Sequence, residues 1–309
     1  MKLLIAAPRG FCAGVERAIR TVEVALGIYP HPVYVKHEIV HNKHVIQDLE
    51  QKGAIFIEDL SQVPEGRVLI YSAHGVSPEV RKEAQKRKLI EIDATCGLVT
   101  KVHSAAKRFA SRGYQIILIG HKNHVEVIGT AGEAPGSTHI VETAQDVDQL
   151  SFSAEDRLCY LTQTTLSVND VQTIRQRLLE KYPSIETLPS SSICYATTNR
   201  QKALQQFAKK TDIFLVVGDP TSSNSNRLRE IAEDEGARSY LINDEVEIDP
   251  SWLFNCKVIG LSAGASTPEA IVEKCISRLE SLGVEEIEEI RYKEENVFFD
   301  IPKKLQVLI

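Results

Sequence analysis

The sequence predicts an α/β fold with parallel sheets, and three observations support this prediction. Short runs rich in Val, Ile and Leu alternate with amphipathic stretches along the 309-residue chain. These apolar runs show little polar alternation, as expected for strands buried on both faces. Small and polar residues follow nearly every run, which is where parallel α/β sheets bind ligands.

Each expected strand ends at polar or glycine-containing residues. The expected strands are residues 3–7, 33–36, 68–72, 90–93, 115–119, 157–162, 213–217 and 257–262. Apolar positions with helical spacing predict the helices between them. These are residues 14–26, 44–52, 79–88, 101–112, 168–181, 201–209, 225–235 and 269–282. Beyond residue 282 we expect a solvated charge run at 285–289 and an arm that packs back through Phe298 and Phe299.

The composition is that of an ordinary globular protein. Lys and Arg number 36 against 42 Asp and Glu, and the net charge of −6 disfavours a dedicated nucleic-acid binder. No apolar stretch reaches the roughly 18 residues that span a bilayer. The apolar part of the first residues is also too short for a signal peptide. We therefore expect a cytoplasmic protein without nucleic-acid or membrane partners.

The six cysteines fall into two groups according to their neighbours. One group lies in or beside apolar runs and is interpreted as core: Cys159, Cys256 and Cys275. The other group follows strand-like runs and stands beside small or polar residues: Cys12, Cys96 and Cys194. Their spacing of roughly 90 residues suggests three similar α/β blocks around a shared centre, although coincidence would give the same spacing. Their thiolates could hold a [4Fe–4S] cluster with one iron lacking a protein ligand, or could be unrelated core residues.

A second set of polar side chains also follows the expected strands. It comprises His41, His74, His121, His124, Ser222, Ser223, Asn224 and Ser266. Imidazoles and neutral donors at helix starts suit a diphosphate, because helix N-termini bind anions without a lysine. A single histidine is more often structural, so this hypothesis depends on several of them converging. Neither GxxxxGK[ST] nor a strand-linked GxGxxG occurs, so nothing supports ATP hydrolysis or NAD(P)H binding.

Glu126 and Thr164 are candidate catalytic residues. Burial would raise the pKa of Glu126 and let it deliver a proton near neutral pH, although it could equally be a solvated loop carboxylate. Thr164 could orient a substrate hydroxyl or cap the following helix. The HxE at residues 124–126 lacks the PCxxC partner of a zinc deaminase. A zinc-dependent hydrolase using His41, His74 and Glu126 stays open at this point, as does a non-enzymatic iron–sulfur sensor.

Taken together, these motifs resemble those of the 4-hydroxy-3-methylbut-2-enyl diphosphate reductase family. The matching stretches are collinear: 8–15, 40–42, 72–76, 93–96, 120–126, 162–167, 194–197, 222–225 and 263–268. The resemblance implies three similar α/β domains in a pseudo-three-fold arrangement around a central iron–sulfur cluster. We place these domains at 13–95, at 96–192, and at 1–12 with 193–282, followed by a C-terminal arm at 283–309. Asp219-Pro220 is one departure from the family's expected pattern.

The resemblance implies reductive dehydroxylation of (E)-4-hydroxy-3-methylbut-2-enyl diphosphate to isopentenyl and dimethylallyl diphosphate, the last step of the non-mevalonate (MEP) isoprenoid pathway. Three cysteines would hold one [4Fe–4S] cluster per chain with an open fourth iron: Cys12, Cys96 and Cys194. Glu126 would supply the proton, with Thr164 and His124 beside it. The substrate-binding set would be His41, His74, His124, Thr164, Ser222, Ser223, Asn224 and Ser266.

The implied electron donor is a ferredoxin or flavodoxin. Both are acidic, so the basic run at residues 81–88 could attract one of them. An ordinary solvated helix face explains the same run.

Overall fold

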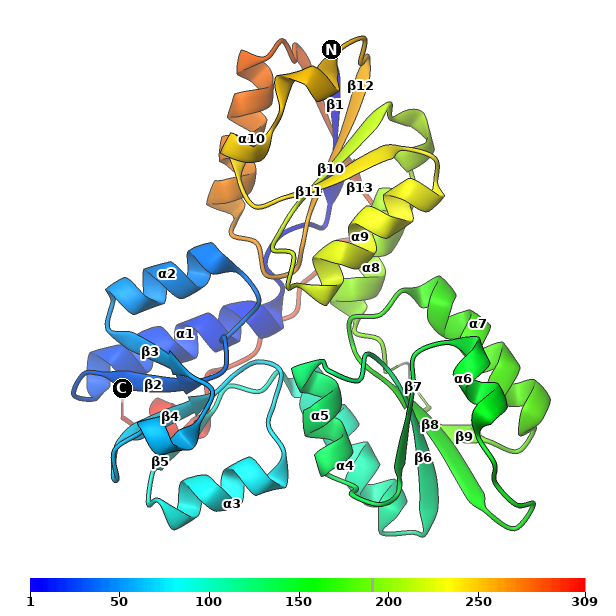
Figure 1. The fold of residues 1–309 in the computed structure, drawn as a ribbon. Helices are drawn as coiled ribbons and strands as arrows, with labels where there is room; N and C mark the ends of the chain where they lie inside the picture. The colour runs from blue at the N-terminus through cyan, green and yellow to red at the C-terminus, as the bar shows by residue number, and fades with distance from the viewer. Residues whose placement is uncertain (190–191, 309) are drawn as a thin grey trace. The chain divides into compact units, whose positions relative to one another are not determined.

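The computed structural model describes residues 1–189 and 192–308, and it confirms the α/β fold with three parallel sheets (Figure 1). The strands are β1 (Lys2–Ala7), β2 (Val33–Lys36), β3 (Ala54–Ile57), β4 (Val68–Tyr71), β5 (Ile90–Asp93), β6 (Tyr114–Ile119), β7 (Thr138–Val141), β8 (Arg157–Thr162), β9 (Glu186–Thr187), β10 (Ile213–Val217), β11 (Arg238–Ile242), β12 (Val258–Ala263) and β13 (Glu286–Arg291). The α-helices are α1 (Ala13–Ile28), α2 (Lys43–Gln51), α3 (Pro78–Lys86), α4 (Gly97–Ala110), α5 (Val125–Gly132), α6 (Ala144–Gln149), α7 (Val168–Lys181), α8 (Tyr195–Gln205), α9 (Ser223–Asp234), α10 (Glu269–Ser281) and α11 (Lys303–Gln306).

The chain divides into two compact units. Unit 1 comprises Met1–Val15, His41–Val45 and Tyr195–Phe298. Unit 2 comprises Glu16–Val40, Ile46–Cys194 and Phe299–Ile309. Unit 1 holds one sheet and unit 2 holds two. This division into two units does not test the boundaries of the three domains expected from the sequence, which stay a prediction.

Unit 1 contains a five-stranded sheet in the order β11-β10-β12-β1-β13, and every neighbouring pair is parallel. Helices cover both of its faces (Figure 1). In β1, Leu3 and Ile5 pack into the cluster that contains α10, whereas Leu4 and Ala6 pack with residues of α8 and α9. Because both faces are buried, the strand is apolar at every position after Lys2, which explains the missing polar alternation.

Unit 2 contains two four-stranded parallel sheets, β3-β2-β4-β5 and β7-β6-β8-β9. In the second sheet, Phe109 of α4 and Val127 of α5 belong to the core on one face. Ile174 and Leu178 of α7 belong to the core on the other face. The first sheet has its own cluster, which includes Ala84 of α3. Helices on both faces again place the loops that follow the strands at one edge of the sheet.

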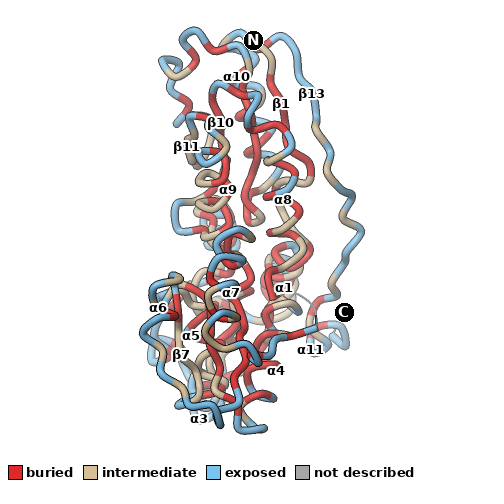
Figure 2. The backbone as a smooth tube through the Cα atoms, turned by 90° about the vertical axis from the view of Figure 1, so that its right-hand side faces the viewer, coloured by how far each residue is buried: buried red, intermediate tan, exposed pale blue. Residues whose placement is uncertain are grey.

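The sequence pattern does not predict five of the strands, and each of these is a sheet edge: β3, β7, β9, β11 and β13. Edge strands have a neighbour on one side only and are more exposed, and four of these five contain polar or charged residues. β3 (AIFI) is an apolar run that the prediction missed. In β13 every residue except Ile290 is exposed (Figure 2). The short helices α5, α6 and α11 are also absent from the sequence-based prediction.

The charge run near the C-terminus is exposed, as expected of a solvated run, but it also forms a strand that the sequence does not predict. β13 pairs in parallel with β1 along its whole length. The Lys2 ammonium lies 2.5 Å from Glu286 and 2.7 Å from Glu288, so the exposed acidic side chains are partly neutralised. The pairing depends on β1, far away in the sequence, and local charge alone does not reveal it. Phe298 is 66% exposed rather than packed back.

No helix in the described part of the chain is both long enough and apolar enough to cross a membrane.

The contact between α9 and the loop after β12 gives a stability prediction. A Cβ atom at Gly264 would lie 2.0 Å from the Ser225 hydroxyl oxygen of α9. We expect Gly264→Ala to displace the helix and to lower the free energy of unfolding by about 1–3 kcal/mol in denaturant titrations. Gly27→Ala is the control, because nothing lies within 4 Å of the added methyl group. Equal stability of the two variants would contradict the close approach.

Candidate active site

Glu126 of α5 is buried in unit 2 and is bonded twice to Thr164. The side chain is 2% exposed. Its Oε1 accepts the backbone N–H of Thr164 at 2.6 Å, and its Oε2 accepts the Thr164 hydroxyl at 2.9 Å. His124, two residues earlier, caps α5, because its Nδ1 accepts the N–H of Glu126 at 3.1 Å. The cap at His124 therefore fixes the start of α5, the helix that carries Glu126. The two hydrogen bonds from Thr164 fix the position of the carboxyl group.

Burial raises the pKa of Glu126 to about 7, against the opposing effect of the Thr164 hydrogen bonds. A carboxyl with this pKa carries and releases a proton near neutral pH, as a general acid must. The interpretation as a solvated loop carboxylate is therefore wrong. Both carboxyl oxygens already accept hydrogen bonds from Thr164, so this group is poorly suited to bind zinc.

Thr164 also connects the carboxyl to Cys194. The Thr164 carbonyl accepts the backbone N–H of Cys194 at 3.0 Å. Cys194 immediately precedes α8 and is only partly exposed. A buried acid, a hydroxyl and a cysteine thus lie along one hydrogen-bonded segment of unit 2.

His74 and His124 come together in unit 2, from the loops after β4 and β6. Their ring centroids are 6.0 Å apart with an edge-to-face geometry. His37 directly follows β2, and the sequence does not single it out. Its ring centroid also lies 6.0 Å from that of His74. His121 instead faces Glu142, with its Nδ1 3.6 Å from the carboxylate. His74 and His124 are therefore the neighbours of Glu126 that can donate to an anion.

Cys96 begins α4 beside the His74 loop. Its backbone N–H donates to the carbonyl of Ala73 at 3.0 Å. β4 and β5 are parallel neighbours, so their carboxyl ends place Cys96 and His74 on adjoining loops.

Unit 1 brings Cys12 together with Ser266. The backbone N–H of Cys12 donates to Ala265 at 3.2 Å, so the loop after β1 lies along the loop after β12. The Ser266 hydroxyl donates to the carbonyl of His41 at 2.8 Å. His41, Ser266 and Cys12 therefore share one region of this unit.

The start of α9 adds anion-binding groups to that region. Ser222 caps the helix, since its hydroxyl accepts the N–H of Ser225 at 3.3 Å, and Ser223 is the first helical residue. Asn224 is buried, and its Oδ1 accepts the N–H of Ala265 at 2.8 Å. The Asn224 Nδ2 is buried and has no hydrogen-bond partner among the described residues. A buried donor of this kind calls for an acceptor, and a phosphate oxygen supplies one.

Asp219, the departure from the expected pattern, ties the His41 segment to this loop. Its Oδ2 accepts the backbone N–H of Lys43 at 3.1 Å. Its Oδ1 accepts the N–H and the hydroxyl of Thr221 at 2.9 and 2.7 Å. The acidic side chain is thus directed into backbone contacts that join the two segments carrying His41 and Ser222.

Three cysteines lie in cores, as the sequence predicts: Cys159, Cys256 and Cys275 are buried. Burial raises the pKa of Cys159 and of Cys275 to about 12, so both thiols stay protonated. Cys12 and Cys96 are partly exposed, like Cys194. Only the partly exposed group has the environment that a thiolate ligand needs.

Sequence reasoning missed His103, which lies buried between two loops of the site. A Cβ at Gly75 or at Gly129 would come within 2.9 or 3.2 Å of its ring. Gly75 follows His74, and Gly129 belongs to α5. Burial lowers the pKa of His103 to about 4, so the ring is neutral. Its place on the buried face of the predicted helix at 101–112 was the only available signal.

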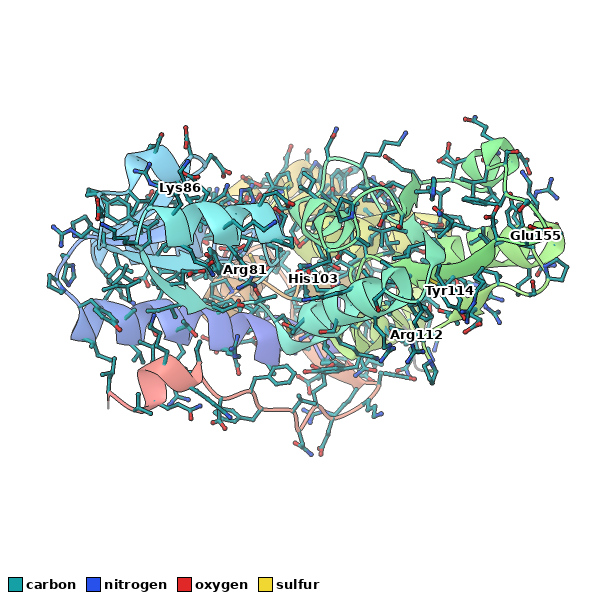
Figure 3. All side chains as sticks on the ribbon, turned by 90° about the horizontal axis from the view of Figure 1, so that it is seen from below. Arg81, Lys86, His103, Arg112, Tyr114 and Glu155 are labelled. Carbon is teal, nitrogen blue, oxygen red and sulfur yellow. The ribbon has the colours of Figure 1, made fainter. Side chains whose placement is uncertain are left out.

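The basic run on α3 is partly used inside unit 2. Figure 3 shows Arg81 beside His103, and Arg81 pairs with Asp93 at 2.8 Å. Arg87 donates to two backbone carbonyls of the preceding loop. Lys86 lies at the surface with 81% of its side chain exposed. The run is therefore mostly a structural and solvated helix face.

The raised pKa of Glu126 gives a prediction about stability. Its folded-state pKa of about 7 exceeds the ordinary 4.5, so ionisation is harder in the folded than in the unfolded protein. We expect the unfolding free energy of the wild type, measured relative to Glu126→Gln, to fall as pH rises between these two values and to level off above the higher one. Denaturant titrations across this range measure it. A difference that is constant or rises with pH would contradict the buried, protonated carboxyl.

Comparisons with known proteins identify the family of this chain. The family model described as "LytB protein" matches residues 3–280. A relative from Protochlamydia amoebophila (strain UWE25), named 4-hydroxy-3-methylbut-2-enyl diphosphate reductase, is 67% identical over 99% of this chain and 97% of its own. The solved structure of the E-1-hydroxy-2-methyl-but-2-enyl-4-diphosphate reductase from Plasmodium falciparum has a TM-score of 0.97 at 49% identity, covering 100% of this chain and 97% of that one. Another solved reductase, described as the terminal enzyme of the non-mevalonate pathway, has a TM-score of 0.65 at 32% identity, covering 91% of this chain and 99% of its own. The chain belongs to the LytB protein family.

Proposed function

We propose that this chain reduces (E)-4-hydroxy-3-methylbut-2-enyl diphosphate to isopentenyl and dimethylallyl diphosphate, the last step of the non-mevalonate pathway. Its family membership and the names of its relatives support this activity over a zinc hydrolase or a sensor. The observation that carries it is the buried carboxyl of Glu126, bonded to Thr164, whose carbonyl holds Cys194. The reaction takes up two electrons and two protons, breaks one C–O bond and releases water.

The family is one of iron–sulfur enzymes, and three cysteines here fit such a group. Cys12, Cys96 and Cys194 are partly exposed, and each lies at or just before the start of a helix. The other three are buried in cores. A [4Fe–4S] cluster on three thiolates supplies single electrons and an iron without a protein ligand, which acts as a Lewis acid toward the substrate oxygen.

Glu126 supplies the proton for the departing hydroxyl. In its protonated form it donates to the Thr164 oxygen, and the Thr164 hydroxyl then donates to the substrate oxygen. Ionised Glu126 accepts the Thr164 hydroxyl, which is the arrangement that the 2.9 Å contact describes. The proton thus moves along existing hydrogen bonds, and burial of the carboxyl excludes competing water.

The diphosphate binds to neutral donors and imidazoles. In unit 1 these are the Asn224 amide, the start of α9 and the hydroxyls of Ser222, Ser223 and Ser266, with His41 beside them. In unit 2, His74 and His124 lie beside the acid. Helix N-termini favour anions through their unpaired N–H groups and dipole.

The electrons come from a low-potential carrier of the ferredoxin or flavodoxin class. The arginines of α3 are engaged within unit 2, so they are poor docking groups for it.

Ligand assignment is tested by metal content. Replacing Cys12, Cys96 or Cys194 by Ser should remove most iron and acid-labile sulfide from anaerobically purified protein, which otherwise carries about four irons per chain. Cys159→Ser is the control and should keep both, because that thiol lies in the core. Equal iron loss in the control, or zinc without iron and sulfide in the wild type, would overturn the assignment.

The proton path is tested by two substitutions of similar shape. Glu126→Gln and Thr164→Val should each lower kcat by about 10²- to 10⁴-fold, because each interrupts proton delivery. Iron content should stay at the wild-type level. Thr164→Ser keeps the hydroxyl and should retain turnover within about tenfold. Steady-state rates with a chemical reductant measure this, and full activity of Glu126→Gln would remove its role as the acid.

A further inference from the structure

Two arginines, one fully buried and one half-buried, hold the backbone just ahead of two of the proposed cluster cysteines. Arg200 lies in unit 1 and is fully buried. Its Nη2 donates to the carbonyls of Gly10 at 2.8 Å and Phe11 at 3.2 Å, and its Nε donates to Gly10 at 3.2 Å. These carbonyls immediately precede Cys12. The guanidinium therefore fixes the path of the chain into that residue.

Glu295 of the C-terminal segment is the counterion of Arg200. Its carboxylate lies 3.2 Å from the Arg200 Nη1, and the side chain is only 13% exposed. The Asn199 amide donates to the same carboxylate at 2.8 Å. A buried guanidinium is costly without a partner, so Glu295 is required to keep Arg200 where it holds the Cys12 loop.

Arg17 of α1 has the same relation to Cys96 in unit 2. Its Nη1 donates to the carbonyl of Thr95 at 3.0 Å, and its Nη2 donates to that of Asp93 at 3.3 Å. Its Nε donates to the carbonyl of Asp300 at 2.7 Å. Here too the guanidinium holds the residue before the cysteine, and its third contact is to the C-terminal segment.

From these contacts we propose that Arg200 and Arg17 are positioning residues for Cys12 and Cys96, and that the segment 295–300 locks both of them in place. The proposal rests on the proposed cluster ligands. The planar guanidinium suits this role, because its fork of donors binds several carbonyls at once in a fixed geometry. Thiolates held in place before iron arrives need less rearrangement to bind it.

Glu295 and Asp300 are the segment residues that contact the two arginines. Both lie outside residues 3–280, the part of the chain that the family model matches. The segment follows β13, whose pairing with β1 anchors it at the edge of the unit 1 sheet. The C-terminal region thus acts on the cysteine loops, and this is a role that the expected arm did not include.

The test is site-resolved alkylation of thiols in the full-length protein after iron removal, read by mass spectrometry. We expect Glu295→Gln to raise the labelling rate of Cys12 by about tenfold, as the loss of a charge-assisted contact implies, and to leave Cys96 within twofold. Arg17→Gln should raise the labelling rate of Cys96 by about tenfold and leave that of Cys12 within twofold. Cys159 serves as the internal reference, since this thiol is buried in a core of unit 2 and reacts only when the fold opens.

Matched controls separate local from general effects. Glu294→Gln removes an exposed neighbouring carboxylate, 68% exposed, that pairs with Arg291. Arg112→Gln removes an exposed arginine of unit 2. Both should label at wild-type rates. Equal acceleration at Cys12 and Cys96 in either test variant, or no acceleration, would overturn the positioning role.

A second measurement on the iron-loaded protein separates this proposal from the proposed function. Glu295→Gln and Arg17→Gln should each release iron to a chelator about tenfold faster than their controls. If the wild type binds no iron, the proposed cluster fails, whatever the labelling shows. If the wild type binds iron and all variants release it at one rate, the positioning role fails and the cluster assignment stands.

Discussion

The two hydrogen bonds from Thr164 to the buried carboxyl of Glu126 are the interaction on which the rest of the site depends. They oppose the effect of burial, which raises the pKa, and leave the group titrating near neutrality. The same threonine accepts the N–H of Cys194, so acid and proposed cluster ligand are set by one residue. Moving Thr164 would therefore disturb proton delivery and ligand placement together.

Parallel sheets explain why polar residues far apart in the sequence lie in the loops at one edge of each sheet. In all three sheets the loops that follow the strands carry the reactive groups, and helices cover the faces. Unit 1 gathers the start of α9, Ser266 and His41, whereas unit 2 gathers the acid with His74 and His124. Each unit thus contributes candidate anion-binding groups, and the buried carboxyl of Glu126 lies in unit 2.

Much of the fold and the site was predictable, because central strands and polar loop residues have local signatures. The strands that escaped prediction are sheet edges, and β13 is a charged run whose pairing with β1 no local pattern contains. The core cysteines were separable by their neighbours. The roles of His103, Asp219, Arg200 and Glu295 were not predictable, because they depend on contacts with distant parts of the chain. Arg200, for example, reaches carbonyls that lie 189 and 190 residues earlier.

The central proposal is that Cys12, Cys96 and Cys194 would hold one [4Fe–4S] cluster with an iron open to the substrate, and that Glu126 and Thr164 would deliver the proton. Mössbauer spectroscopy of iron-57 protein, with and without the allylic diphosphate, tests it most directly. The account predicts that one iron of about four changes its signal when substrate binds, while the others do not. Signals that are the same for every iron and unaffected by substrate would contradict it.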